Sequence, residues 1–169
     1  MIKPSGPLMV EHRLIEKMVN LLKKEIIRIK KDGYLNSKFI DSAVDFFRIY
    51  ADKTHHGKEE DILFKAMAKK PMSSDMKNMM DELIKDHITA RLQVSALAEC
   101  KNNDKAIEIM QSLIALYPPH IQKEDIMFFP KSMKLLSEEE QDAMTKEFYE
   151  FDRKMIHTKY KSVVEALSK

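Results

Sequence analysis

Glycine, proline and cysteine are all scarce in this chain of 169 residues. It contains three glycines, six prolines and one cysteine, whereas leucine, methionine, alanine, glutamate and lysine are frequent. Few glycines leave few places for tight hairpin turns, and the frequent residue types favour helices. The single cysteine, Cys100, cannot form an internal disulfide, and we interpret it as a residue without a redox role. The composition predicts an all-α fold.

Long apolar runs and an excess of charge of one sign are absent as well. No run approaches the roughly 18 residues that a membrane-spanning helix needs, and the first residues, MIKPSGPLMVEHR, lack the apolar core of a secretory signal. The 29 lysines and arginines nearly balance the 27 aspartates and glutamates, and their signs alternate along the chain. We therefore expect a cytoplasmic protein with no membrane and no nucleic-acid partner.

Helix-breaking residues divide the chain into five segments. The predicted helices span residues 7–31, 37–69, 75–101, 104–129 and 138–167. Ser137 and Glu140 have the spacing of a capping box, which fixes the start of the last helix, and Pro118 and Pro119 should kink or briefly break the fourth. We expect one domain, residues 1–169, formed by an up-and-down four-helix bundle at about 7–130 and an additional C-terminal helix at about 138–167.

Each of the first four segments carries an apolar stripe at helical spacing, which predicts the face that packs into the core. The predicted core residues are Leu8, Ile15, Val19, Leu22, Ile26, Ile40, Val44, Phe47, Ala51, Ile62, Ala66, Met80, Leu83, Ala90, Val94, Leu97, Ile109, Leu113, Leu116 and Met127.

Polar residues interrupt every one of these stripes. They are His12 in the first segment, His55 and Glu59 in the second, His87 in the third, and His120 and Glu124 in the fourth. A buried carboxylate or imidazole without a partner is costly, so this set requires bound cations or protons.

The positions of the four histidines along the helices give an independent test. Helices that run up and down must place partners at equal distances from the loop that they share. All four histidines meet this condition within about two residues, or roughly 3 Å at the rise of an α-helix. In both His-x-x-x-Glu pairs, the two side chains leave the same face of the helix. The sequence therefore predicts one polar cluster at one level of the bundle.

These residues resemble the hemerythrin-like, or HHE cation-binding, family. The matching pieces are Glu11-His12-Arg13, the run HHGKEEDILF at 55–64, Asp86-His87, and the run HIQKEDIMFFP at 120–130. The resemblance implies a di-iron centre with an oxo or hydroxo bridge, for which zinc or manganese could substitute. The implied metal ligands are His12, His55, Glu59, His87, His120 and Glu124, with the two glutamates bridging the irons.

Several residues near this cluster leave alternatives open. His56 and Glu60 repeat the spacing of His55 and Glu59, but we prefer the earlier pair because it continues the apolar stripe. Tyr50 could supply a phenolate, although packing is the simpler role. Arg91 stands where the oxygen-carrying members have a further histidine, so a ligand is lost there. Its guanidinium could steady a bound anion, or it could form a surface salt bridge.

Partners for the outer nitrogens of the histidines are not evident from the sequence. Glu11 and Asp86 each precede a ligand histidine and point about 100° away from it, so we expect backbone carbonyls to serve instead. His157 has no matching partner in the last helix, and we expect it to be exposed. That helix either caps the bundle or forms a homodimer contact.

Ligand counting directs the functional prediction. Two six-coordinate irons with four histidines, two bridging glutamates and a bridging oxide keep about two positions open. We expect a protein that binds, senses or reduces a small ligand such as dioxygen, nitric oxide or peroxide. If it turns over, it is a di-iron oxidoreductase; the sequence identifies neither catalytic residues nor an electron donor. The alternative is an iron-storage or sensor module without turnover.

Two other readings have weaker support from the sequence. A ferritin-like carboxylate oxidase would carry Glu-x-x-His motifs, and no histidine here has a glutamate three residues before it. A helical interaction protein with hydrogen-bonded core histidines would contain no metal.

Overall fold

The computed structural model describes residues 3–167, without the side chains of residues 157, 158 and 160–167. The described residues form helices and no strands. The elements are α1 (Ser5–Asp32), α2 (Ser37–Asp45), η1 (Phe46–His56), η2 (Glu59–Phe64), α3 (Lys65–Met67), α4 (Ser74–Glu99), α5 (Asn103–Lys123), η3 (Glu124–Phe128), α6 (Phe129–Leu135) and α7 (Glu138–Leu167).

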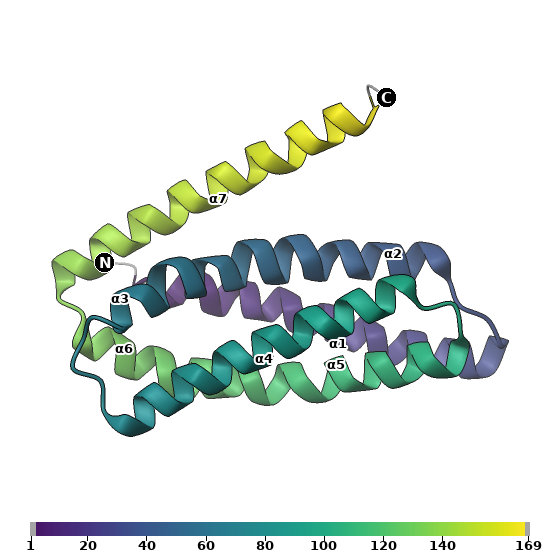
Figure 1. Ribbon diagram of the computed structural model, residues 1–169, viewed down its shortest axis with the longest axis horizontal. Coiled ribbons are helices and arrows are strands. Elements are labelled where there is room, and N and C mark those ends of the chain that lie inside the picture. Colours follow the sequence, from purple (N-terminus) through teal and green to yellow (C-terminus); the bar gives the residue numbers. More distant parts are fainter. Residues whose placement is uncertain (1–2, 168–169) are drawn as a thin grey trace.

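Several of these elements join end to end, so residues 3–167 fold into five long helices. The elements α2, η1, η2 and α3 make one continuous second helix, and α5, η3 and α6 make one continuous fourth helix. These two helices form an up-and-down bundle with α1 and α4, while α7 runs back over the second helix and diverges from it towards the C-terminus (Figure 1). The all-α bundle with an additional C-terminal helix is confirmed.

Capping side chains fix the starts of the long helices that follow α1, which itself has no side-chain cap. Asn36, Ser73 and Asn102 each accept a hydrogen bond from the backbone N–H three residues later, which satisfies one free donor of the first turn. The backbone N–H of Ser137 donates to Glu140 while the N–H of Glu140 donates to the Ser137 hydroxyl, as the capping box predicts. At the end of α1, Gly33 adopts a φ of 78°, a conformation that favours glycine.

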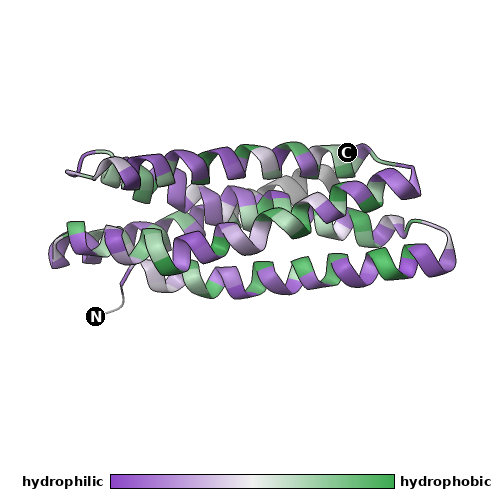
Figure 2. Cartoon of the chain, turned by 90° about the horizontal axis from the view of Figure 1, so that it is seen from below, coloured by the Kyte–Doolittle hydropathy of each residue, from purple (hydrophilic) through white to green (hydrophobic). Residues whose placement is uncertain are grey.

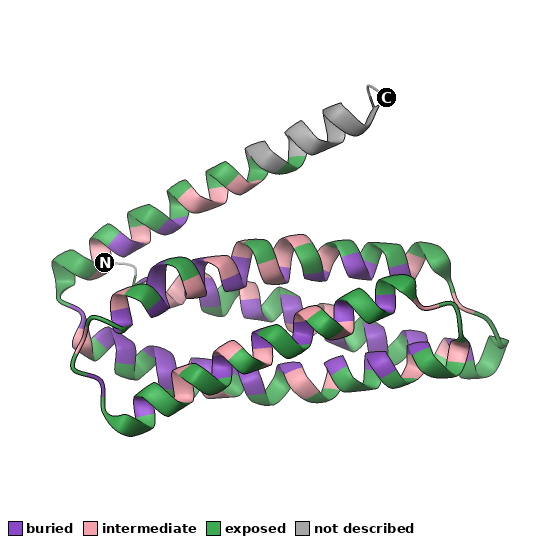
Figure 3. Cartoon of the chain, in the orientation of Figure 1, coloured by how far each residue is buried: buried purple, intermediate pink, exposed green. Residues whose placement is uncertain are grey.

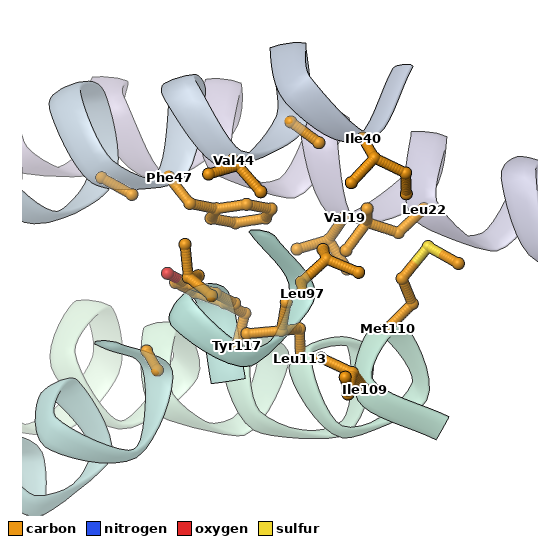
Figure 4. Packing of buried hydrophobic residues seen from close by; sticks show 14 of the residues in the cluster. Val19, Leu22, Ile40, Val44, Phe47, Leu97, Ile109, Met110, Leu113 and Tyr117 are labelled. Carbon is orange, nitrogen blue, oxygen red and sulfur yellow. The ribbon is translucent and has the colours of Figure 1, made fainter. Parts of the chain in front are cut away.

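The bundle interior consists of two apolar clusters with a polar layer between them. The first cluster lies towards the end of the bundle with residues 33–36, where Phe47 stacks on Tyr117 and Val19 and Leu113 pack nearby (Figure 4). The second lies at the opposite end and includes Phe128 and Phe148, the latter from α7. Hydrophobic and hydrophilic residues alternate along the helices (Figure 2), and the buried residues lie on their inner faces (Figure 3).

The apolar stripes predict this core well except near residue 127. Ala66, Met80 and Leu116 are half-buried, and Met127 is 45% exposed, whereas every other predicted stripe residue is buried. Met127 lies in η3, a stretch of π-helix in which each turn contains more residues than an α-turn. This change of register turns Met127 outward, and Phe128 and Phe129 occupy the core instead.

Prolines break the fourth helix less than their positions predict. The helix continues through Pro118 and Pro119 without a break and does not end until Leu135. The two prolines are exposed, as is Ala115 one turn before Pro119, so water can reach the carbonyl that loses its partner there. Pro130 lies where η3 passes into α6 within the same continuous helix.

Among the described residues, none of the helices has the length and apolarity needed to cross a membrane.

Candidate metal centre

The polar layer brings together all six residues predicted as ligands, and His56 with them. Every side chain of this set is at least 97% buried, and the set draws on all four helices of the bundle. The residues are His12 of α1; His55 and His56 of η1; Glu59 of η2; His87 of α4; His120 of α5; and Glu124 of η3. Their donor atoms fall into two groups, each within 4.8 Å: His12 with His55 and both glutamates, and His56 with His87 and His120.

Each glutamate lies between two histidines. The Oε2 of Glu124 is 3.1 Å from Nε2 of His12 and 3.2 Å from Nε2 of His120. The two oxygens of Glu59 lie 3.4 Å from Nε2 of His55 and from Nε2 of His87, one oxygen to each. Each carboxylate therefore faces both the His12–His55 side and the His87–His120 side. Glu59 directs one oxygen to each side, as a bridging carboxylate does, whereas Glu124 directs Oε2 to both sides and its Oε1 lies 3.9 Å from Nε2 of His87.

The inward-facing atoms of this cluster have no aligned hydrogen-bond partner. This holds for Nε2 of His12, His55, His87 and His120 and for both oxygens of Glu59 and Glu124, all of which are buried. Leaving so many buried donors and acceptors unpaired would cost far more than a domain of this size can tolerate. Imidazole nitrogens and carboxylate oxygens converging in this way fit divalent metal ions.

The outer nitrogens of the same four histidines all contact carboxylates. The Nδ1 atoms of His12, His55, His87 and His120 lie 2.7, 2.8, 2.7 and 3.2 Å from carboxylate oxygens of Asp125, Glu11, Glu60 and Asp86, respectively. Such a contact fixes the ring orientation, keeps the proton on Nδ1 and leaves Nε2 free to bind metal.

The expectation that Glu11 and Asp86 would not support histidines is wrong. Each points away from the histidine beside it, as expected, but it points towards a histidine on the neighbouring helix. Glu11 of α1 supports the second helix, Glu60 of the second helix supports α4, Asp86 of α4 supports the fourth helix, and Asp125 of the fourth helix supports α1. The carboxylates thus form a closed ring around the bundle, which we call the support ring.

Two consecutive histidines of η1 both face the interior. In an α-helix they would diverge by about 100°, but η1 is π-helical and its successive side chains diverge less. The His56 ring stacks on that of His87 with centroids 3.8 Å apart, and its Nδ1 lies 3.3 Å from Asp52. Of the later pair, only Glu60 lies outside the cluster, where it contacts His87. His56 lies inside the cluster together with His55.

Arg91 and Tyr50 lie outside the polar cluster. The Nε of Arg91 is 2.7 Å from Asp52 and its Nη2 is 2.8 Å from Glu60, so the guanidinium holds the carboxylates that contact His56 and His87. Tyr50 lines a groove between η1 and α7. Partial burial, together with the charges of Glu11 and Asp152, raises the pKa of its phenol to about 12.

When no cation is present, the histidines and glutamates of the cluster share protons, and their pKa values shift in opposite directions. Burial and the neighbouring charge of Glu124 raise the pKa of Glu59 well above its usual range. Burial alone would also raise the pKa of Glu124, but His120 and His12 reverse that effect and hold it low. Burial lowers the pKa of His55 to about 4, whereas the carboxylates of Glu124 and Asp86 raise the pKa of His120 to about 9 against the effect of burial. A bound cation would replace these protons.

A buried lysine connects the cluster to α7. Lys58 is fully buried and forms ion pairs with Glu11 and, at 2.8 Å, with Asp152 of α7. Next to it, a Cβ on Gly57 would lie 2.7 Å from the ring of Phe151, so α7 packs directly on the backbone between two predicted ligands. Sequence reasoning missed this lysine because both of its partners, Glu11 and Asp152, lie far from it in the chain.

An all-α bundle that buries a cluster of histidines and glutamates of the kind that binds metal ions is typical of one class of helical metal-binding proteins. Within that class, residues 4–157 match the family model described as the hemerythrin HHE cation-binding domain, and the chain belongs to this family. Comparison with curated proteins and with solved structures returned no match.

Proposed function

We propose that this chain binds two iron ions through His12, His55, Glu59, His87, His120 and Glu124. The observation that carries the proposal is the placement of each glutamate between a histidine on one side of the cluster and a histidine on the other. In this assignment His12 and His55 bind one ion, His87 and His120 bind the second, and the carboxylates bridge them. Mixed imidazole and carboxylate ligands suit iron, and zinc or manganese could substitute.

The residues around the cluster hold this ligand set in place. The support ring orients the four imidazoles, while the two apolar clusters exclude bulk water from both ends of the centre. Iron, when bound, supplies reversible binding and redox chemistry towards dioxygen, nitric oxide or peroxide. We therefore propose a non-haem di-iron protein that binds, senses or reduces such a small ligand in the cytoplasm. A free cysteine is consistent with that location.

Metal analysis together with a visible spectrum tests the ligand assignment. The wild-type protein should contain about two irons per chain after expression in iron-rich medium. His120→Ala and Glu124→Ala should each lose at least one of them, whereas His157→Ala, a histidine outside the ligand set, should keep both. Two metals retained in the His120 and Glu124 variants would refute the ligand set.

Anaerobic addition of peroxide or dioxygen to the ferrous protein separates the two functional classes. Repeated consumption of the added oxidant identifies an oxidoreductase. A single stoichiometric change in the spectrum identifies a sensor or storage module without turnover.

A further inference from the structure

His56 is the one histidine of the polar layer that the six-residue assignment does not use. Its side chain is 1% exposed, and one nitrogen of each of His56, His87 and His120 falls within 4.8 Å of the others. The centroids of the His56 and His120 rings are 6.0 Å apart. Three imidazoles gathered this closely from three helices form a metal-binding group in their own right.

The Nδ1 contact of His56 is that of a supported ligand, but its ring is stacked on that of His87, 14° from parallel, so both can bind one ion only after one ring turns. The Nδ1 of His56 faces the carboxylate of Asp52, as the Nδ1 atoms of the other four histidines face carboxylates. Asp52 differs from the support ring because it lies one turn before His56 on the same helix. Arg91 of α4 compensates for this by holding Asp52 and Glu60 together, which ties the supports of His56 and His87 to one guanidinium.

The backbone of η1 places His56 in this position. An α-helical register that directs His55 into the cluster would carry His56 towards the side of the bundle. The π-helical register brings both rings inward, at the cost of a less favourable hydrogen-bond geometry over Phe46–His56. Single π turns occur often at functional sites, where they aim a side chain that regular geometry would misplace.

His56 lies between a cleft and the rest of the cluster. A cavity of about 640 Å³ opens between the second helix and α4, and its lining includes Arg91 and Asp52 as well as His56 and Tyr117. A smaller space, lined by His56, His87 and His120, lies next to the cluster. His56 lines both spaces and so stands between the cleft and the other two histidines.

We propose that His56 is a seventh ligand, bound to the metal that His87 and His120 hold. This rests on the proposed two-metal centre and makes it asymmetric, because one metal then has three histidines and the other has two. One of the two open positions is thereby filled. The position that stays free for a small ligand belongs to the metal bound by His12 and His55, on the side away from the Arg91-lined cleft.

Counting zinc-bound histidines by NMR tests this proposal without altering the site. A His157→Gln background leaves five histidines, and the protein is labelled with ¹⁵N and loaded with zinc alone. The imidazole ¹⁵N resonances distinguish a metal-bound nitrogen from a free one, and the signal missing from His56→Ala identifies His56. We expect five metal-bound imidazoles. Four, with His56 unbound, would overturn this proposal and leave the six-residue centre intact, whereas no bound imidazole would overturn both.

Zinc affinity supplies the second measurement. His56→Ala should weaken one of two zinc sites by at least about 10- to 100-fold, the loss that removing only the outer partner of a ligand causes, and added imidazole should restore much of the loss by binding in the vacated space. The matched control is Tyr117→Phe, which alters a neighbour of His56 on the same cleft wall without removing a nitrogen. If His56→Ala and Tyr117→Phe both bind two zinc ions as tightly as wild type, His56 is not a ligand.

Discussion

Arg91 illustrates how a single residue can act on a centre that it does not touch. Its guanidinium forms one contact with Asp52 and another with Glu60, and these carboxylates in turn contact His56 and His87. The side chain is 37% exposed, so its ion pairs add little to folding stability. Its effect should therefore fall on the orientation of two imidazoles.

Replacing Arg91 by alanine separates its effect on metal affinity from its effect on folding stability. We expect Arg91→Ala to weaken metal binding by about 10-fold, the lower end of the loss for an outer support, because Arg91 contacts the carboxylates and not a histidine. The free energy of unfolding of the metal-free protein should fall by less than about 1 kcal/mol. Metal titration and urea unfolding measure the two quantities.

The matched control for this change is Arg28→Ala. The guanidinium of Arg28 also donates hydrogen bonds to carboxylates, including that of Glu25, but it lies on α1, away from the centre. It should leave metal affinity unchanged. Equal loss of affinity in both variants would show that Arg91 acts through general stability.

The six candidate ligands could be proposed from single residues, but the carboxylates that contact them could not. A histidine or glutamate that interrupts an apolar stripe is visible along one helix, which is why all six predicted ligands fall inside the polar layer. The support ring joins each histidine to an acid on another helix, so it depends on how the helices are rotated against each other. Each acid of the support ring stands directly beside a predicted ligand in the chain, as Asp86 and Asp125 do, and this was the available signal.

Among the elements, the π-helical stretches are what the sequence could not reveal. Helix ends followed from helix-breaking residues such as Gly33 and from the capping box at Ser137 and Glu140, because both signals are local. A π turn forms only because tertiary packing stabilises it, so residues 46–64 have no pattern that distinguishes them from an α-helix. The outward turn of Met127 and the inward turn of His56 both follow from this.

The packing of α7 on the second helix makes a prediction at Gly57. A side chain there would meet Phe151, since a Cβ would lie 2.7 Å from its ring. We expect Gly57→Val to lower the free energy of unfolding by roughly 1–3 kcal/mol through overpacking. In a Phe151→Ala background the clash is gone, and Gly57→Ala should stabilise the helix by about 0.5–1 kcal/mol. Urea unfolding of the single and double variants checks both signs.

Lys58 makes a second prediction for the same helix pair. Its ammonium group is fully buried between Glu11 and Asp152, so replacing it with methionine keeps the bulk and leaves two carboxylates facing each other. Because those carboxylates keep some contact with water, we expect Lys58→Met to cost about 2–3 kcal/mol, less than a fully enclosed pair. Chemical denaturation measures the loss, and Lys65→Met, at an exposed pair on the same helix, should cost under about 1 kcal/mol.

For the molecule as a whole, the unpaired inner atoms link folding to metal. A ligand that binds only the folded state stabilises it by about 2.7 kcal/mol at one hundred times its dissociation constant. For a chain of this size that corresponds to a rise in Tm of roughly 5–10 °C. Calorimetry of the chelated and reloaded protein should show this rise, and His120→Ala should show a smaller one. Identical melting with and without metal would contradict a centre at this position.

The support ring should also determine which positions vary together among related sequences. Each helix carries one acid that serves the next helix and one histidine that depends on the previous one, so no helix of the bundle can change at this level alone. A chain related to this one that loses the acid at position 11 should show a change at position 55, and likewise for positions 60 and 87, 86 and 120, and 125 and 12. Covariation in the family should therefore run around the bundle in one direction and close on itself.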